Sequence, residues 1–406
     1  MKTLVVAGHG MAGHRLVSEL RSLDTAGSWR VVVLAEEPHP AYDRVALSSY
    51  LDGRSAADLA LSGPDADADA DPMVDLRLNT RVTAVDRDTR TVTTTTGEAI
   101  RYDALVLATG SKPFIPPVPG HDLPGCFVYR SLTDLDAIRG AAVPGRPGVV
   151  IGGGLLGLEA ANALRLLGME PHVVELAPRL MPLQVDAAGG GVLGRRVEER
   201  GLHVHCGVAT ASVQAGPDGR ASAVALADGT ALEAAVVVFS AGVRPRDELA
   251  APAGLPTGER GGFLTDPLCR TPDDRIWAIG ECAAVSGRTY GLAAPGYRMA
   301  ESVARQLSAR PAEPFTDPDM STSLKLLGVE VASFGDAHAH TEGSMALTRL
   351  DASAGTYAKL VLSPTHTLLG GILVGDARAY ATLHPFVGHP LPPAAHHLLA
   401  APAPAA

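Results

Sequence analysis

The amino-acid sequence predicts an α/β protein with two doubly wound, three-layer domains and a small C-terminal α+β domain. Two short apolar runs each lead into a glycine cluster and then into a helical pattern, at residues 4–13 and 147–159. From Phe315 onward the sequence instead shows short strands separated by turns. The two glycine clusters therefore predict two Rossmann-like, nucleotide-binding domains.

The second glycine cluster has the G-x-G-x-x-G spacing, with glycines at Gly152, Gly154 and Gly157. The first glycine makes the turn from strand to helix, the second admits a pyrophosphate, and the third lets the helix pack on the strand. Glu175 ends the next apolar run, 175 − 157 = 18 residues after the last glycine. An acid at this position accepts a ribose 2′-hydroxyl and repels a 2′-phosphate.

The first glycine cluster repeats this pattern at the beginning of the sequence, with Gly8, Gly10 and Gly13. Its acid is Glu36, which lies 36 − 13 = 23 residues later, after the apolar run 31–34. One glycine-rich turn is weak evidence, but two complete patterns predict two nucleotide-shaped ligands on one chain.

Composition excludes several classes of function. The 406 residues carry a formal net charge of −10, and no basic stretch occurs, so we expect no nucleic-acid partner. No run of eighteen apolar residues occurs, so we expect no membrane span, and the start of the sequence does not resemble a signal peptide. The scattered cysteines form no C-x-x-C pair, which predicts reduced thiols in a cytoplasmic protein without an iron–sulfur cluster or a dithiol.

We predict no metal site. The alternating alanines and aspartates of residues 62–72 indicate a solvated surface loop, since they supply no turn glycine and no closing glutamate. Four histidines near the end of the sequence do not fit one helix face: His384, His389, His396 and His397. His9 lies inside the first glycine cluster, where we expect no catalytic role for it.

The remaining elements follow from local patterns. Leu16, Val17 and Leu20 recur at helical spacing after the first glycine cluster. Strands are expected at residues 76–78, 82–85, 91–95, 104–107, 235–239, 276–279, 323–329, 330–334, 357–362 and 368–374, and helices at 295–309 and 380–383. Residues 116–121 are rich in proline and predict a hinge.

In order, the motifs are a glycine fingerprint, Ala-Thr-Gly, a second fingerprint, Ser-Ala-Gly and Ile-Gly-Glu-Cys. This order resembles the FAD-dependent pyridine nucleotide-disulfide oxidoreductase superfamily. Within it, the chain is most similar to the N-terminal FAD/NAD(P)H-binding half of the assimilatory NAD(P)H nitrite reductase large subunit. The stretches that carry this resemblance are residues 42–51, 150–159, 175–182, 239–246, 291–301 and 321–336.

Two departures limit the resemblance. The family's cysteine-rich iron–sulfur and sirohaem regions have no counterpart here, so we do not expect this chain to reduce nitrite by itself. Related ferredoxin and rubredoxin reductases have Leu-Ser-Lys where this sequence has Leu47, Ser48 and Ser49. We therefore expect no lysine–glutamate pair beside the flavin.

The resemblance implies FAD on the first fingerprint and NADH on the second, with NADPH less favoured because of Glu175. Glu36 would hold the adenosine ribose, Arg44 a phosphate and Glu281 the ribitol. The implied FAD residues are Gly8, Gly10, Met11, Ala12, Gly13, Glu36, Glu37, Arg44, Ser48, Val82, Ala108, Thr109, Gly110, Lys112, Arg130, Gly280, Glu281, Ala293 and Pro295. The implied NAD residues are Gly152, Gly153, Gly154, Leu155, Leu156, Gly157, Glu159, Glu175, Ala241 and Gly242.

Glu159, near the nicotinamide in relatives, is the one catalytic candidate, with a role in positioning. Structural alternatives remain open: Glu36 could be a solvent-exposed acid, Arg44 a surface ion-pair residue and Glu159 a partner within its own helix. For Lys112 and Arg130, a role in binding FAD and a purely structural role are equally favoured.

The resemblance implies that nicotinamide C4 passes a hydride to flavin N5, and that the flavin delivers electrons to an external protein. That acceptor would be a component of assimilatory nitrite or nitrate reduction. Two alternatives remain: a reductase for a ferredoxin-like or rubredoxin carrier of another pathway, and a non-enzymatic flavin redox sensor. The implied domains are an FAD domain at 1–117 and 243–314, an NAD(P)H domain at 118–242, and a C-terminal interface domain at 315–395 that could form a homodimer. A disordered tail is expected at 396–406.

Overall fold

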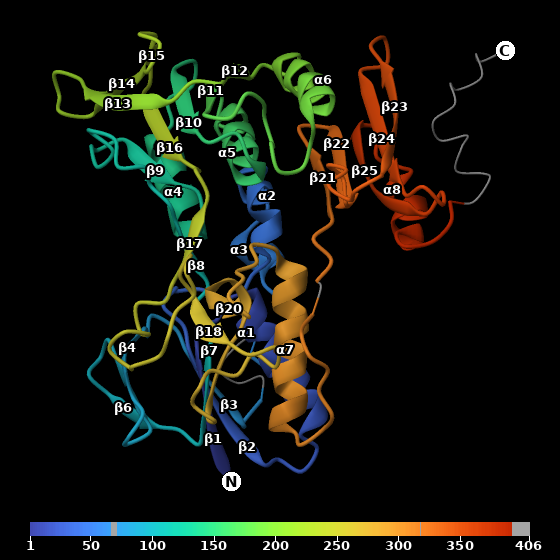
Figure 1. Cartoon of the computed structure of the whole chain (residues 1–406). Helices are drawn as coiled ribbons and strands as arrows, with labels where there is room; N and C mark the ends of the chain where they lie inside the picture. Colours follow the sequence, from blue (N-terminus) through green and yellow to red (C-terminus); the bar gives the residue numbers. More distant parts are fainter. Residues whose placement is uncertain (66–70, 317, 392–406) are drawn as a thin grey trace. The chain divides into compact units, whose positions relative to one another are not determined.

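A computed structural model describes residues 1–65, 71–316 and 318–391. The chain divides into two compact units, each built from two separate stretches (Figure 1). The first unit contains Met1–Pro113 and Val243–Pro318, and the second contains Phe114–Gly242 and the residues from Asp319 onward. Among the described helices, none is long and apolar enough to cross a bilayer.

The first unit is built on a parallel five-stranded sheet with the order β19-β7-β1-β2-β3. Its strands are β1 (Lys2–Ala7), β2 (Trp29–Leu34), β3 (Val74–Arg77), β7 (Ala104–Leu107) and β19 (Ile276–Ala278). The packed helices α1 (Met11–Leu23) and α7 (Ala293–Leu307) accompany this sheet, as does the antiparallel sheet of β4 (Val82–Asp86), β5 (Thr91–Thr94) and β6 (Ala99–Arg101). Both sheets and both helices contribute to one apolar core, which is why the central parallel strands are buried on both faces.

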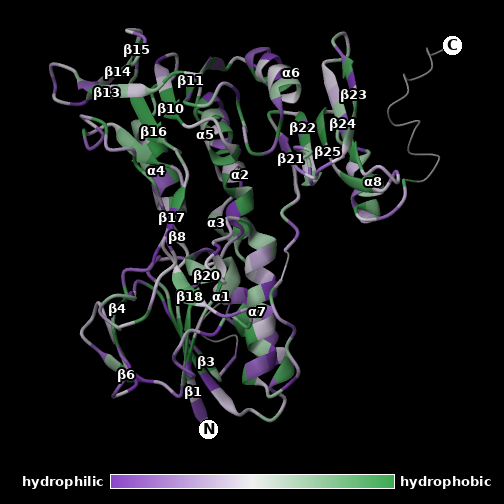
Figure 2. Cartoon of the chain, in the orientation of Figure 1, coloured by the Kyte–Doolittle hydropathy of each residue, from purple (hydrophilic) through white to green (hydrophobic). Residues whose placement is uncertain are grey.

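The second unit repeats this plan with the parallel order β9-β16-β10-β11-β12. Its strands are β9 (Cys126–Val128), β10 (Pro147–Ile151), β11 (Glu170–Glu175), β12 (His203–Cys206) and β16 (Val236–Phe239). The helices are α4 (Leu132–Ala141), α5 (Leu155–Leu166) and α6 (Ala187–Glu198), and β13 (Thr210–Ala215), β14 (Ala221–Leu226) and β15 (Ala231–Glu233) form a small antiparallel sheet. Figure 2 shows that the helices α5 and α7 carry both hydrophobic and hydrophilic residues.

The C-terminal part of the second unit is an antiparallel sheet with the order β21-β22-β25-β24-β23. Its strands are β21 (Thr322–Leu326), β22 (Val329–Gly335), β23 (Met345–Asp351), β24 (Thr356–Leu362) and β25 (Leu368–Gly375), followed by α8 (Tyr380–Leu383) and η3 (His384–Phe386). A separate apolar core lies beneath this sheet, and α6 packs against β24 and β25.

Short elements complete the first unit. They are η1 (Arg44–Ala46), α2 (Leu47–Leu51), α3 (Ala56–Leu59), η2 (Gly280–Cys282), the antiparallel pair β8 (Ser111–Pro113) and β17 (Val243–Pro245), and the parallel pair β18 (Phe263–Thr265) and β20 (Ala283–Val285).

The fold class predicted from sequence is confirmed, whereas several local expectations are wrong or incomplete. Strand β23 was not predicted because its side chains are mostly exposed and give no clear alternation. The strand expected at residues 76–78 begins at Val74 instead. Asp65, expected in a solvated loop, is completely buried. The expected disordered tail lies outside the described residues.

Candidate nucleotide-binding sites

The first glycine loop joins β1 to α1, and two of its glycines are fixed by the surrounding backbone. Gly8 has a φ of +111°, and a Cβ there would lie 2.2 Å from the carbonyl oxygen of Ala108. A Cβ on Gly13 would lie 2.5 Å from the carbonyl oxygen of Gly8. A Cβ on Gly10 would meet nothing within 4 Å. The middle glycine therefore leaves open space in which a ligand can approach the backbone.

The second loop, between β10 and α5, has the same geometry. Gly152 has a φ of +116°, and its Cβ would lie 2.3 Å from the carbonyl oxygen of Ser240. The Cβ of residue 157 would lie 1.8 Å from the carbonyl oxygen of Gly152, which makes glycine necessary at Gly157. Gly154 again faces open space.

Both helices that leave these loops present their amide ends without a capping side chain. The N-caps of α1 and α5 are Gly10 and Gly154, each with an extended backbone, and neither first turn contains an acid. Their first turns begin with Met11 and Ala12, and with Leu155 and Leu156. Since the first amides of a helix lack intrahelical acceptors and carry partial positive charge, both ends are suited to an anion.

The expected small residues lie where β7 and β16 end. Thr109 Oγ1 donates a hydrogen bond to the carbonyl oxygen of Arg246 at 2.5 Å. Gly110 and Gly242 have φ values of +71° and +100°, and a Cβ on either would meet nothing within 4 Å. Ala108 and Ala241 precede these turns, so each sheet offers a narrow backbone edge next to its glycine loop.

Glu36 follows β2 and is paired with arginine. Its side chain is 40% exposed and forms ion pairs with Arg246 and, at 3.9 Å, with Arg81. A ribose hydroxyl could reach this carboxylate, but the ion pairs also fit the alternative of a surface acid.

Glu37, Tyr42 and Arg44 form a compact polar group beside η1. Tyr42 Oη donates to Glu37 at 2.7 Å, and Arg44 donates to both Tyr42 Oη, at 2.8 Å, and Glu37. Burial acts to lower the pKa of Arg44, but the charges of Tyr42, Glu37 and Glu281 outweigh burial and raise it. The guanidinium therefore keeps its positive charge while only 21% exposed, which suits it to an anionic ligand.

Glu281 lies in η2 and accepts a hydrogen bond from Ser111 Oγ at 3.0 Å. The preceding Gly280 has a φ of +73°, and a Cβ there would lie 3.1 Å from Cβ of Ala12. Gly280 therefore lies next to the first turn of α1. Ala293 and Pro295 begin α7 in the same unit, Ser48 lies on α2, and Val82 begins β4.

Two basic candidates are less well supported. Lys112 lies on β8 with a half-exposed side chain that pairs with Glu248. Arg130 follows β9 in the second unit, whereas the other FAD candidates belong to the first unit. Both assignments stay predictions.

Glu175 is fixed at the second loop by two backbone amides. Its Oε2 accepts from the amide of Gly153 at 2.6 Å, and its Oε1 accepts from the amide of Ala177 at 2.7 Å. A Cβ on Gly153 would lie 2.9 Å from Glu175 Cβ and 2.7 Å from Leu180 Cδ2. The second glycine in the run 152–154, Gly153, is thus explained by the acid that packs against it.

Glu159 lies one turn into α5, close to Tyr129. Burial and the charge of Glu159 together raise the pKa of Tyr129 well above its usual range. Tyr129 therefore stays protonated beside the helix that begins at the second loop.

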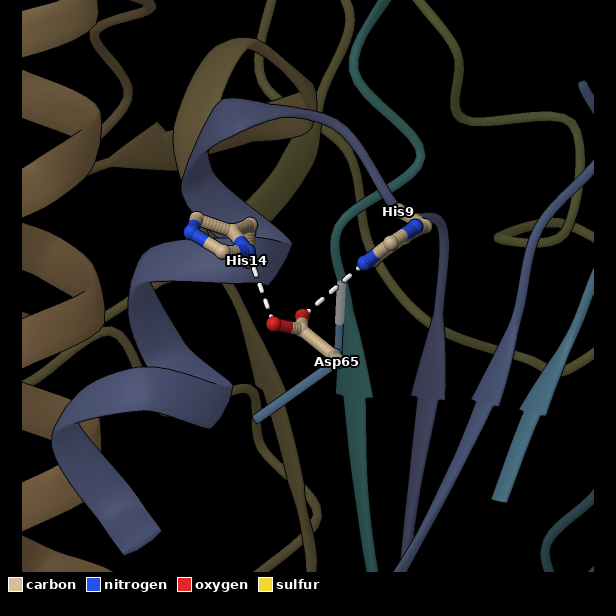
Figure 3. Close-up of side chains that lie close together, drawn as sticks. All are labelled: His9, His14 and Asp65. Atoms are coloured by element: carbon tan, nitrogen blue, oxygen red, sulfur yellow. Dashed lines mark hydrogen bonds and ion pairs between the residues drawn. The ribbon is translucent and has the colours of Figure 1, made fainter. Parts of the chain in front are cut away.

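One cluster was not expected from the sequence. The side chains of His9, His14 and Asp65 lie together in the first unit, and their ligand atoms are all within 4.8 Å of one another. Figure 3 shows Asp65 between the two rings, with one carboxylate oxygen directed at each. Local spacing could not reveal this cluster, because Asp65 lies more than fifty residues from the histidines.

The four cysteines are free, as predicted. Burial raises the pKa of Cys126 and of Cys206 to about 11, so neither is a ready thiolate. The buried Cys282 donates to the carbonyl oxygens of Leu107 and Ile279. None of these thiols is placed as a redox-active dithiol.

Comparisons with known proteins agree with this geometry. The family model for pyridine nucleotide-disulphide oxidoreductases matches residues 2–302, and that for the rubredoxin NAD⁺ reductase C-terminal domain matches residues 321–387. The chain is 49% identical to the nitrite reductase [NAD(P)H] large subunit of Klebsiella oxytoca over 94% of its length, covering 39% of that protein. It is 34% identical to the assimilatory nitrate reductase electron transfer subunit of Bacillus subtilis over 92% of its length, covering 48% of that protein.

The chain thus spans less than half the length of both relatives. Among solved structures, a ferredoxin reductase of Rhodopseudomonas palustris superposes with a TM-score of 0.83 at 29% identity, covering 94% of this chain and 93% of that one. Two glycine loops at the edges of two parallel sheets, a family match over three-quarters of the chain and a shared fold lead to one conclusion. The chain belongs to the pyridine nucleotide-disulphide oxidoreductase family, whose members bind FAD and a nicotinamide dinucleotide.

Proposed function

We propose that the first loop binds FAD, that the second binds NADH, and that electrons pass from NADH through the flavin to an external protein acceptor. The observation that carries this proposal is the repeated loop geometry, in which the first and third glycines close against backbone and Gly10 and Gly154 face open space. FAD, when bound, can accept a hydride and release electrons one at a time.

The chain's own residues would hold and orient these groups. The first amides of α1 and α5 would bind the two pyrophosphates. Arg44 would add a partly buried positive charge near the first of them, and Glu36 and Glu281 would accept hydroxyl groups of FAD. Glu159 would help to position the nicotinamide.

The preference for NADH over NADPH rests on Glu175. Its carboxylate is already held by the amides of Gly153 and Ala177, so it cannot turn away from the loop without losing two hydrogen bonds. A 2′-phosphate at this position would meet a fixed negative charge, whereas a 2′-hydroxyl could donate to it.

The acceptor class is proposed from the relatives. An electron transfer subunit of assimilatory nitrate reduction and a nitrite reductase large subunit both align along nearly all of this chain. We therefore propose a component of assimilatory nitrite or nitrate reduction as the acceptor. A rubredoxin or ferredoxin-like carrier is the second candidate, favoured by the match of residues 321–387 to the rubredoxin NAD⁺ reductase C-terminal domain.

Two finer expectations belong to this proposal. The antiparallel C-terminal sheet would form the homodimer interface. The four free thiols favour a reducing compartment such as the cytoplasm.

Anaerobic double mixing tests the proposal. NADH should bleach the flavin absorbance near about 450 nm, and a second mix with oxidised acceptor protein should restore it within the time of one turnover. Rubredoxin, ferredoxin and the nitrite reductase partner would be compared as acceptors. A flavin that NADH reduces but that none of these proteins reoxidises would contradict the proposed electron transfer.

A further inference from the structure

We propose that His9, His14 and Asp65 form a binding site for a divalent transition metal of the Zn²⁺ type. Each ligand comes from a different segment of the first unit. His9 lies in the glycine loop, His14 on the second turn of α1, and Asp65 in the loop after α3. Two imidazoles and one carboxylate form a donor set suited to zinc.

The three side chains are withdrawn from water. Their exposed fractions are 1% for His9, 10% for His14 and 0% for Asp65. His9 Nε2 lies 2.9 Å from Asp65 Oδ2, and His14 Nδ1 lies 2.7 Å from Asp65 Oδ1. A tetrahedral zinc ion keeps neighbouring ligand atoms about 3.3 Å apart, so these atoms need to separate by only about half an ångström.

Unsatisfied polar atoms gather at the same place. Among the described residues, His9 Nδ1 and Ser18 Oγ are buried and make no hydrogen bond. A Cβ on Gly63 would lie 2.7 Å from His14 Cε1, 2.9 Å from Ser18 Oγ and 3.2 Å from Asp65 Oδ1, so Ser18 adjoins the cluster. Buried polar atoms of this kind are costly unless a further group satisfies them.

Metal binding needs an ionised carboxylate and neutral imidazoles. The cluster ready to bind a metal therefore carries one negative charge. A bound divalent cation would turn it into one positive charge.

This change of sign matters because His9 lies between Gly8 and Gly10. If that loop holds a pyrophosphate, as the proposed function requires, a net positive cluster inside it stabilises the ligand and a negative one opposes it. The metal site itself does not depend on the flavin, since all its ligands belong to the chain.

Metal analysis of the full-length protein tests the proposal. The protein is incubated with Zn²⁺, dialysed against metal-free buffer and assayed for zinc per chain. We expect about one zinc per chain in the wild type and at least a tenfold loss in Asp65→Ala and in His9→Asn. The His9→Asn variant keeps a side-chain donor for Asp65, so a purely hydrogen-bonding role for His9 would leave its stability unchanged.

His384→Ala is the matched control. His384 Nε2 lies 2.7 Å from Asp319 Oδ2, the same kind of pair, but in an exposed position of the second unit. This variant should keep its zinc. Thermal unfolding gives a second readout, since Zn²⁺ should raise the unfolding midpoint of the wild type but not that of Asp65→Ala. Equal zinc content in the wild type and both site variants, or no zinc in any of them, would overturn the proposal.

Discussion

The two parallel sheets repeat one plan. Their glycine loops differ at the residue between the first two glycines of each G-x-G-x-x-G pattern. Strands β1, β2 and β7 correspond in order to β10, β11 and β16, and a three-stranded antiparallel sheet precedes β7 and β16 in the chain. In the first loop that residue is His9, which contacts Asp65. In the second it is Gly153, whose amide bonds Glu175.

The difference concerns how each loop is prepared for its ligand. Glu175 is held by the amides of Gly153 and Ala177, and in the proposed function it would keep both contacts when a nucleotide binds. Glu36 is paired with Arg246, and in the proposed function it would give up that ion pair for a ribose hydroxyl. The comparison teaches that the two loops share their backbone geometry, whereas the side chains around each loop differ.

Replacing the first glycine of either loop should have the largest effect. Gly8→Ala and Gly152→Ala each place a Cβ within about 2.3 Å of a carbonyl oxygen at a positive φ, so each should cost at least about 3 kcal/mol locally. Gly8→Ala should yield protein without FAD, and Gly152→Ala should retain FAD that NADH no longer reduces. Flavin content and anaerobic bleaching measure both, and the reverse pattern would assign the loops to the opposite ligands.

Replacing the middle glycines should affect ligands but not folding. Gly154→Ala should raise KM for NADH about tenfold at unchanged flavin content, and Gly10→Ala should weaken FAD binding by about the same factor, or about 1.4 kcal/mol. Gly194→Ala on α6 is the control, since its Cβ also meets nothing within 4 Å and it lies outside both loops. Unchanged KM in Gly154→Ala would contradict the approach of a phosphate to that residue.

The acid of the second loop should set the choice of nicotinamide. Glu175→Ala removes the fixed charge, so we expect the ratio of kcat/KM for NADH over NADPH to fall about tenfold. Glu36→Ala is the matched variant at the first loop and should leave this ratio unchanged. If the ratio fell in Glu36→Ala and not in Glu175→Ala, Glu36 would be the acid that sets the choice of nicotinamide.

The smallest expected effect is a pH dependence confined to the second unit. Burial, together with the nearby His203 and His205, lowers the pKa of His172 to about 4. Because an unfolded histidine titrates near about 6.5, the unfolded chain binds more protons between pH 6.5 and 4, and stability falls as the pH is lowered through this window.

His172→Gln should remove this part of the acid sensitivity, worth at most about 3 °C in the unfolding midpoint because the group is only partly buried. Thermal unfolding between pH 7.5 and 4.5 measures the difference. His340→Gln, at an 84% exposed side chain, should behave like the wild type. If the unfolding midpoints of the wild type, His172→Gln and His340→Gln changed with pH in the same way, this acid sensitivity could not be assigned to His172.

Most of the fold was predictable because its signals are local. The glycine spacing, the apolar strands and the helical repeats each lie within a few residues, and α1 begins where Gly10 predicts. Strand β23 was missed because it is paired with β24 but is largely exposed, and exposure removes the alternating pattern on which such a prediction depends.

The candidate sites were less predictable, since they depend on contacts between distant segments. The pairing of Glu36 with Arg246 spans 210 residues, and the burial of Asp65 depends on two histidines at the first loop. The low-complexity pattern around Asp65 suggested solvent exposure, and no local signal could indicate otherwise. The domain boundaries and the ligand roles of individual residues stay predictions.

The central claim is that a flavin and a nicotinamide exchange electrons on this chain without a thiol relay. An anaerobic titration of the FAD-loaded protein with NADH tests it most directly. One equivalent of NADH per flavin should bleach the flavin completely, because the four cysteines are free and offer no second two-electron acceptor. Consumption of two equivalents before full bleaching, or a flavin that NADH does not reduce, would contradict the account.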